Sequence, residues 1–159
     1  MIHVRGLGPD DALALREIRL RALADTPENF GSLVAIEAAE PEAHWRAWLG
    51  KCTWFAGFEG DRAVAIVCGL PGQPDWSLFS MWVAPEARGN GLAARLADEV
   101  RAAAEVAGAH AIGLHVFEDN HRARRIYERL GYVATGVWED VEGKGRRERM
   151  RLVLHPDAE

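Results

Sequence analysis

Apolar residues recur along the chain with two different periods, and each period predicts a different kind of element. Helical spacing, with an apolar residue every three or four positions, predicts helices at about residues 9–24, 34–49 and 92–107. A fourth helix ends at Leu130, before a glycine, and begins at a cap supplied by Asp119 or Asn120. The apolar face of the first helix is expected to carry Leu13, Ile18, Leu20 and Leu23.

Shorter apolar or alternating runs predict seven strands. They are expected at residues 2–6, 52–58, 62–69, 76–83, 111–117, 132–138 and 147–154. The turn Glu59-Gly60-Asp61 is typical of a hairpin, and the charged stretch 139–146 is expected to connect the last two strands. Strands that come first as hairpins and later alternate with helices indicate a mixed α/β (α+β) fold in one domain, residues 1–159.

Composition sets the class of protein. A chain of 159 residues with 48% hydrophobic and 27% charged residues can bury a proper core, which excludes a largely disordered protein. Cys52 and Cys68 are too few for a disulfide framework or a cysteine-based zinc site, so no metal site is expected. No apolar run approaches the ~20 residues of a membrane span, and the first residues lack a signal-peptide pattern. We therefore expect a cytoplasmic protein without a membrane partner.

The net charge of −5 is unevenly distributed. Residues 1–87 hold 7 Lys and Arg against 12 Asp and Glu, whereas residues 88–159 hold 12 of each. A mildly acidic chain without a basic run is a poor nucleic-acid binder. The acidic first half favours a cationic ligand on that side. Nearly all basic residues are arginines, whose planar fork suits phosphate.

The stretch Val83-Ala84-Pro85-Glu86-Ala87-Arg88-Gly89-Asn90-Gly91-Leu92-Ala93 predicts a strand, a turn and the first turn of a helix. Unpaired N–H groups at a helix N-terminus, approached closely through glycines, can cradle a pyrophosphate. The alternative is an ordinary strand–helix turn. Residues 89–94 also match the dinucleotide-binding pattern G-x-G-x-x-A, but the turn is long and the next strand supplies no acidic residue.

These residues extend into a wider resemblance. Arg88-x-x-Gly91-x-Ala93 resembles the R/Q-x-x-G-x-G/A signature of the GCN5-related N-acetyltransferase (GNAT) family. Asn120-x-x-Ala123-x-x-x-Tyr127-x-x-x-Gly131-Tyr132 resembles a second segment of that family. The resemblance is strong over residues 76–138. The segment Arg19-Leu20-Arg21-Ala22-Leu23 of the first helix, with Pro27, Phe30 and Gly31 in the loop after it, is similar to the first helix and loop of one bacterial branch.

The resemblance implies a fold and a cosubstrate. The fold is a mixed, mostly antiparallel seven-stranded sheet, splayed between strands 4 and 5 and flanked by helices. Acetyl-CoA would lie in the splay, with its pantetheine beside the backbone of Met81, Trp82 and Val83. Its pyrophosphate would meet the N–H groups of Arg88, Gly89, Asn90, Gly91, Leu92 and Ala93.

Four residues of the second segment have competing interpretations. Asn120 can cap a helix, contact the cofactor, or do both. Tyr127 lies about two helical turns later and could simply pack, but the resemblance implies that it protonates the departing CoA thiolate. Arg124 or Arg125 is expected to meet a CoA phosphate, although a solvated basic face is the alternative.

The residues that would bind the acceptor amine are harder to predict from the sequence. Many relatives have a glutamate near the start of the fourth strand, where this chain has Asp75-Trp76-Ser77-Leu78. The general base therefore stays open among Asp75, Glu37, Glu40 and a water chain. The acidic run of Glu37, Glu40 and Glu42 could line an acceptor pocket or form a solvated helix face. His44 and His115 are expected to be structural.

The combined expectation is an acetyl-CoA-dependent N-acetyltransferase acting on a primary amine of a small molecule or a protein. Direct transfer in a ternary complex is expected, because neither cysteine lies in the motifs as an acyl carrier. The alternative is a non-catalytic CoA-binding regulatory module on the same fold. Homodimers are common in similar proteins.

Overall fold

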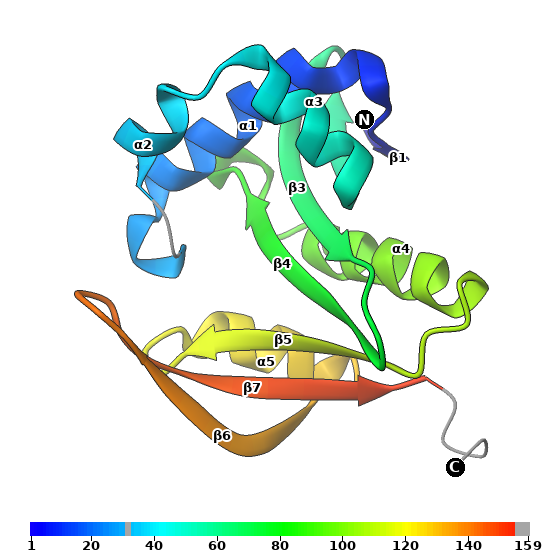
Figure 1. Cartoon of the computed structure of the whole chain (residues 1–159), viewed down its shortest axis with the longest axis vertical. Coiled ribbons are helices and arrows are strands. Elements are labelled where there is room, and N and C mark those ends of the chain that lie inside the picture. The colour runs from blue at the N-terminus through cyan, green and yellow to red at the C-terminus, as the bar shows by residue number, and fades with distance from the viewer. Residues whose placement is uncertain (31–32, 155–159) are drawn as a thin grey trace.

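Seven strands form one sheet in the order β1-β2-β3-β4-β5-β7-β6, as Figure 1 shows. The computed structural model describes residues 1–30 and 33–154. The strands are β1 (Ile2–Gly6), β2 (Thr53–Glu59), β3 (Arg62–Leu70), β4 (Asp75–Val83), β5 (Ala111–Phe117), β6 (Val133–Val141) and β7 (Gly145–Val153). The helices are α1 (Ala12–Asp25), α2 (Val34–Ala38), α3 (Glu42–Lys51), α4 (Leu92–Val106) and α5 (His121–Arg129).

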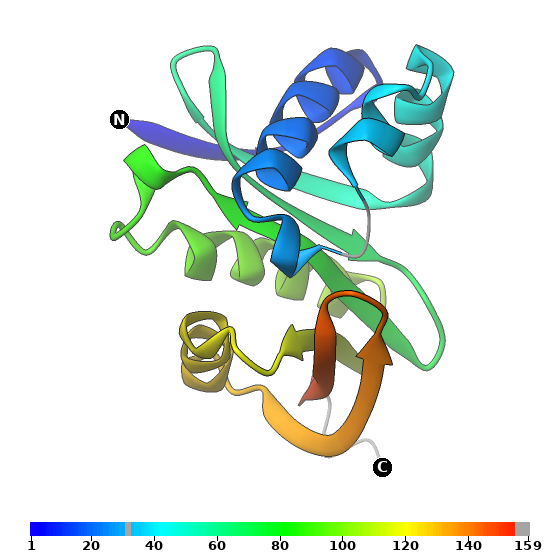
Figure 2. The same ribbon diagram turned by 90° about the vertical axis from the view of Figure 1, so that its left-hand side faces the viewer.

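The sheet is mixed, because β4 and β5 are parallel while every other pair of neighbours is antiparallel. The β4–β5 ladder spans only Asp75–Ser77 against Ala111–Gly113. Beyond it the two strands diverge (Figure 1), and Figure 2 looks into the opening. The expected mostly antiparallel sheet, splayed between its fourth and fifth strands, is therefore confirmed.

A bulge in β4 accompanies the divergence. Cys68 of β3 pairs with Phe79 and Ile66 pairs with Trp82, so two β4 residues oppose the single residue between them on β3. Ser80, inside the bulge, has φ +59°, a left-handed conformation that is costly for a side chain with Cβ. A bulge bends its strand, which is consistent with β4 turning away from β5.

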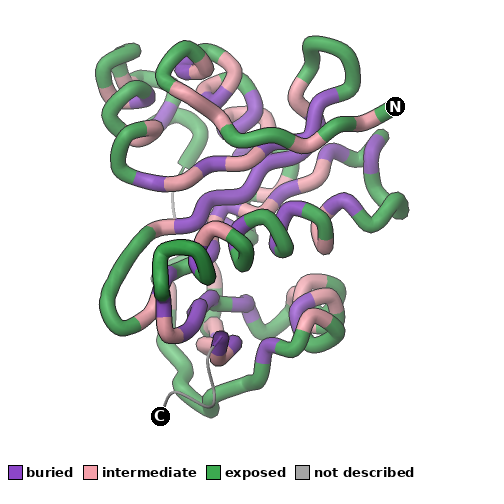
Figure 3. Tube along the Cα trace, turned by 90° about the vertical axis from the view of Figure 1, so that its right-hand side faces the viewer, coloured by how far each residue is buried: buried purple, intermediate pink, exposed green. Residues whose placement is uncertain are grey.

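Helices cover both faces of the sheet. The N-terminal helices α1–α3 lie over one face, and α4 and α5 lie over the other (Figures 1 and 2). Glycines on the sheet let α4 approach closely, since a Cβ at Gly57 would lie 3.2 Å from Leu92 and one at Gly69 would lie 3.0 Å from Val100. Figure 3 shows the buried central strands between helices whose outer turns are exposed. The core thus holds β3 and β4 between the two layers of helices.

The structure corrects three expectations about the elements. The helix expected at 34–49 is two helices, because Pro41 caps α3 and its ring disfavours helix in the preceding residue. Leu13 is 66% exposed and not part of the buried face of α1. The connection expected at 139–146 is mostly strand, since cross-strand pairs such as Glu139–Arg147 extend the β6–β7 ladder to Val141–Gly145.

The remaining strands and helices agree with expectation to within about two or three residues, and Asn120 rather than Asp119 caps α5. Gly31, part of the bacterial-branch pattern, lies outside the described residues. Within residues 1–30 and 33–154, no helix is long and apolar enough to cross a membrane.

Candidate active site

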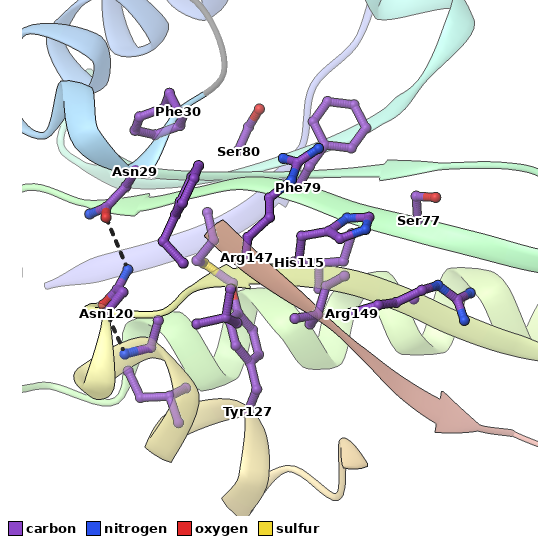
Figure 4. Close-up of a pocket in the computed structure, with 18 of the residues that line it drawn as sticks. Asn29, Phe30, Ser77, Phe79, Ser80, His115, Asn120, Tyr127, Arg147 and Arg149 are labelled. Atoms are coloured by element: carbon purple, nitrogen blue, oxygen red, sulfur yellow. Dashed lines mark hydrogen bonds between the residues drawn. The ribbon is translucent and has the colours of Figure 1, made fainter. Parts of the chain in front are cut away.

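A cleft of about 470 Å³ opens where β4 and β5 part (Figure 4). Both strands line it, together with β7, α5, the start of α4 and the segment Asn29–Phe30. The cleft therefore touches both motifs that the sequence singles out and also strands that neither motif contains.

The first motif forms the N-terminus of α4. Gly91 is the N-cap, with φ +71°, and Gly89 has φ +87°. A Cβ at either glycine would meet nothing within 4 Å, so this turn has open space around its backbone. The first N–H groups of a helix lack intrahelical partners, and the helix dipole favours an anion there. The geometry fits the pyrophosphate cradle that the sequence predicts.

Side chains around this turn point elsewhere. Arg88 does not extend toward the cradle: its Nε donates to the Val83 carbonyl at 2.9 Å, and its Nη2 lies 2.7 Å from Asp25 Oδ2 on α1. Leu92 is buried against β2, and Asn90 is exposed. The Nδ2 of Asn90 donates to the Ala87 carbonyl at 3.4 Å, so the three side chains have partners within the protein and the backbone N–H groups remain the candidates to face a phosphate.

The β4 segment expected to hold pantetheine divides in two. Met81 lines the cleft. Trp82 is buried and its indole N–H donates to Asp25 Oδ2 at 2.9 Å, so its side chain belongs to the packing against α1. Val83 pairs with Ala65 of β3. The β5-facing backbone edge of this segment lies beyond the short β4–β5 ladder and is available to a ligand.

Asn120 performs the cap role and also lines the cleft. Its Oδ1 accepts the Ala123 backbone N–H at 3.2 Å, and its Nδ2 donates to Asn29 Oδ1 at 3.2 Å (Figure 4). The two interpretations of Asn120 are therefore compatible. The bond to Asn29 also joins α5 to the segment after α1 across the mouth of the cleft.

Tyr127 lies on the cleft-facing side of α5 and is 6% exposed. Its ring packs edge-on against Tyr132, with 5.6 Å between centroids. Burial raises the pKa of Tyr127, because a phenolate would be poorly solvated there. The hydroxyl therefore stays protonated at neutral pH, which is the state a proton donor needs.

Arg124 is not free to meet a phosphate in this structure. Its Nη2 lies 2.8 Å from Glu148 Oε1, and it does not line the cleft. Glu148 is buried and also accepts the Gly136 N–H at 2.9 Å. The pair ties α5 to the β6–β7 hairpin.

The three carboxylates considered as general base are poorly suited to that role. Arg151 and Arg149 hold the pKa of Asp75 at about 2, outweighing the partial burial that raises it. Glu37 is buried and accepts from Arg19 through both oxygens, at 2.9 and 3.0 Å. Glu40, after α2, does not line the cleft.

The acidic run is thus neither an acceptor pocket nor a simple solvated face. Glu37 closes a buried network in which Arg19 Nη1 also donates to Ser80 Oγ at 2.7 Å. Glu42 is exposed and lies 3.3 Å from Arg46. The network links α1 and α2 to the β4 bulge.

His115 lines the cleft, although the sequence led us to expect a structural role for it. Its side chain is 38% exposed, and it lies on β5 beside Arg147 and Arg149 (Figure 4). Burial, and secondarily the charge of Arg147, lower its pKa, while Glu139 opposes the shift. The imidazole is therefore neutral at pH 7. Strand register brings it to the cleft, and a lone histidine in a sequence carries no sign of that register.

Comparison with known proteins identifies the family. The model of the Acetyltransferase (GNAT) family matches residues 18–132, and the chain belongs to this family. Acetyl-CoA, the cosubstrate expected from the sequence, is thereby confirmed at the level of the family. The comparison with curated proteins gave no match.

Solved structures agree on the fold. An acetyltransferase of the GNAT family from Streptococcus pneumoniae is 20% identical, with TM-score 0.84 over 97% of this chain and 99% of that one. The yncA structure from Salmonella typhimurium, described with its cofactor acetyl-CoA, is 17% identical, with TM-score 0.80 over 97% and 94%. The ribosomal-protein-S18-alanine N-acetyltransferase from Escherichia coli is 18% identical, with TM-score 0.73 over 97% and 94%.

Proposed function

We propose that this protein transfers the acetyl group of acetyl-CoA directly to the nitrogen of a primary amine. The observation that carries the proposal is the single cleft that joins the N-terminus of α4, Tyr127 and His115 between the diverging strands β4 and β5. Acetyl-CoA supplies an activated acetyl carbon, which the neutral amine attacks while the carbon–sulfur bond breaks.

Two proton transfers complete the reaction. The amine loses one proton on forming the amide, and neutral His115 is the cleft residue suited to accept it. The departing thiolate gains one proton, which the Tyr127 hydroxyl donates. Solvent then restores both groups, so the net products are the N-acetylated amine and CoA thiol.

Direct transfer is supported by the state of both cysteines. Cys52 and Cys68 are buried and do not line the cleft. Burial raises the pKa of each thiol, which disfavours the thiolate that an acyl carrier requires. An acetylated cysteine intermediate is therefore not part of the proposal.

A thiol-release assay with acetyl-CoA and a panel of primary amines tests the function. The panel includes amino acids, amino acid amides, polyamines and peptides with free N-termini. We expect at least one amine to raise CoA release well above the rate of hydrolysis, with a matching acetylated product by mass. Tight CoA binding without amine-dependent release would instead support the non-catalytic module.

A further inference from the structure

The charged side chains that line the cleft are all basic. Among residues 1–30 and 33–154 they are Arg19, Arg147 and Arg149, and no Asp or Glu side chain lines it. A cationic acceptor such as a polyamine would find no carboxylate in this lining. The described acidic side chains of the first half, which favoured such an acceptor, therefore do not line the cleft.

The three arginines differ in how their charge is balanced. Arg19 is neutralised by Glu37, and Arg147 pairs with Glu139. Arg149 has no carboxylate to itself. Its Nη2 lies 2.6 Å from Asp75 Oδ2, and the same carboxylate takes Arg151 at 2.8 and 3.0 Å.

Arg149 thus shares the Asp75 carboxylate with Arg151, and its guanidinium also borders the cleft. The side chain of Asp75 is 12% exposed and does not line the cleft, whereas Arg149 is 33% exposed and does. The carboxylate therefore anchors Arg149 from one side and leaves its guanidinium accessible to a ligand from the other.

A glycine makes the place for this guanidinium. A Cβ on Gly113 would lie 2.7 Å from Arg149 Nη2 and 3.1 Å from its Cζ, so any other residue here would displace Arg149. Gly113 pairs with Ser77 at the last rung before β4 and β5 part. The guanidinium consequently lies across the floor of the cleft, where the splay begins.

We propose that the acceptor carries a carboxylate, bound by Arg149 at this floor, in addition to its reacting amine. The inference rests on the proposed acetyl transfer and names the chemical class of its acceptor. His115 is two residues from Gly113 on the same face of β5, about 7 Å along the strand. A small amino acid, or a peptide N-terminus with a nearby acidic side chain, spans that separation.

Paired acceptors that differ only in charge test the inference. Each amino acid in the panel is compared with its amide, and a peptide beginning Asp-Leu-Leu with one beginning Asn-Leu-Leu. These two comparisons distinguish a free amino acid from a peptide as the source of the carboxylate. Because a charge-assisted hydrogen bond contributes about 1.5–3 kcal/mol, we expect kcat/KM to favour the carboxylate form roughly 10- to 100-fold in one comparison.

Arg149→Gln should reduce that preference to near unity, measured as the ratio of kcat/KM for the charged and uncharged members of each pair within the same variant. Arg146→Gln is the matched control, because Arg146 is an exposed arginine of the same strand that pairs with Glu118 away from the cleft. The control should keep the full preference.

The outcomes separate the two proposals. If amines react but the charged and uncharged members of each pair are equal, or if Arg149→Gln keeps the preference, the inference is overturned and acetyl transfer stands. If no amine raises CoA release, the proposed function fails and the inference fails with it.

Discussion

The two sides of the cleft are built in different ways. On the proposed cofactor side, the backbone is open at the β4 edge, where the β4–β5 ladder has ended, and at the turn before Leu92, where Gly89 and Gly91 leave space. On the acceptor side, side chains from β4, β5 and β7 meet on one face through strand register. A site made of backbone tolerates many sequences for one ligand, whereas a site made of side chains can change its ligand by single substitutions.

The largest effect is expected where the two sides meet, at Tyr127. Tyr127→Phe removes the proton donor and keeps the ring, so kcat should fall about 100-fold with little change in the KM for acetyl-CoA. Steady-state kinetics with an amine from the panel measure it. Tyr132→Phe is the matched control, because that buried hydroxyl has no partner in the described structure and should be dispensable for turnover.

His115→Gln tests the acceptor side next. A base works when unprotonated, and burial with Arg147 lowers the pKa of His115, so wild-type kcat/KM should rise with pH through a pKa below 6.5. In the variant we expect the rise of kcat/KM with pH to disappear. We also expect kcat/KM at pH 7 to fall at least tenfold. A pH profile that keeps the same acidic limb in the variant would assign the base elsewhere.

These two residues show what the sequence could and could not predict. Tyr127, Asn120 and Gly91 lie in contiguous segments whose spacing is visible in one chain, so their placement could be anticipated. His115 and Arg149 come together only because β5 pairs with β7 in one register and β4 ends its ladder at Ser77. Pairing between distant strands depends on the whole sheet and leaves no local pattern.

The same distinction explains the errors in charge. The acidic residues of the first half suggested an acidic pocket. In the structure, however, Glu37 forms an ion pair with buried Arg19, and Asp75 forms ion pairs with Arg149 and Arg151. A formal charge count takes no account of the ion pairs in which the charged residues are held. Likewise the side chains of Arg88 and Arg124 each have a carboxylate within 2.8 Å, a partner that the sequence does not show.

Gly91→Ala tests the cofactor side. A non-glycine residue at φ +71° costs roughly 1–2 kcal/mol, which the turn can relieve only by leaving its open geometry. We expect acetyl-CoA affinity, measured by calorimetry, to fall about fivefold. Gly108→Ala places the same strain, at φ +76°, after the other end of α4 and should lower stability without weakening acetyl-CoA binding. Equal affinities in the two variants would contradict a cradle at Gly91.

The smallest effect concerns the acid stability of the acceptor floor. The folded pKa of Asp75, about 2, lies below its ordinary value of 3.8, so its contribution is present above about pH 4 and is lost as the pH falls toward 2. Discounted for partial solvent screening, the contribution is about 1 kcal/mol. Urea unfolding of wild type and Asp75→Asn should differ by that amount at pH 6 and converge near pH 2. A difference that persists at pH 2 would assign the effect to packing.

Simultaneous occupation of both sides is the central claim, and a two-substrate initial-rate matrix tests it most directly. Acetyl-CoA and a reactive amine are varied together while CoA release is followed. Direct transfer in a ternary complex predicts double-reciprocal lines that intersect, with a rate that depends on both concentrations. Parallel lines, or CoA release that is independent of the amine, would contradict the account.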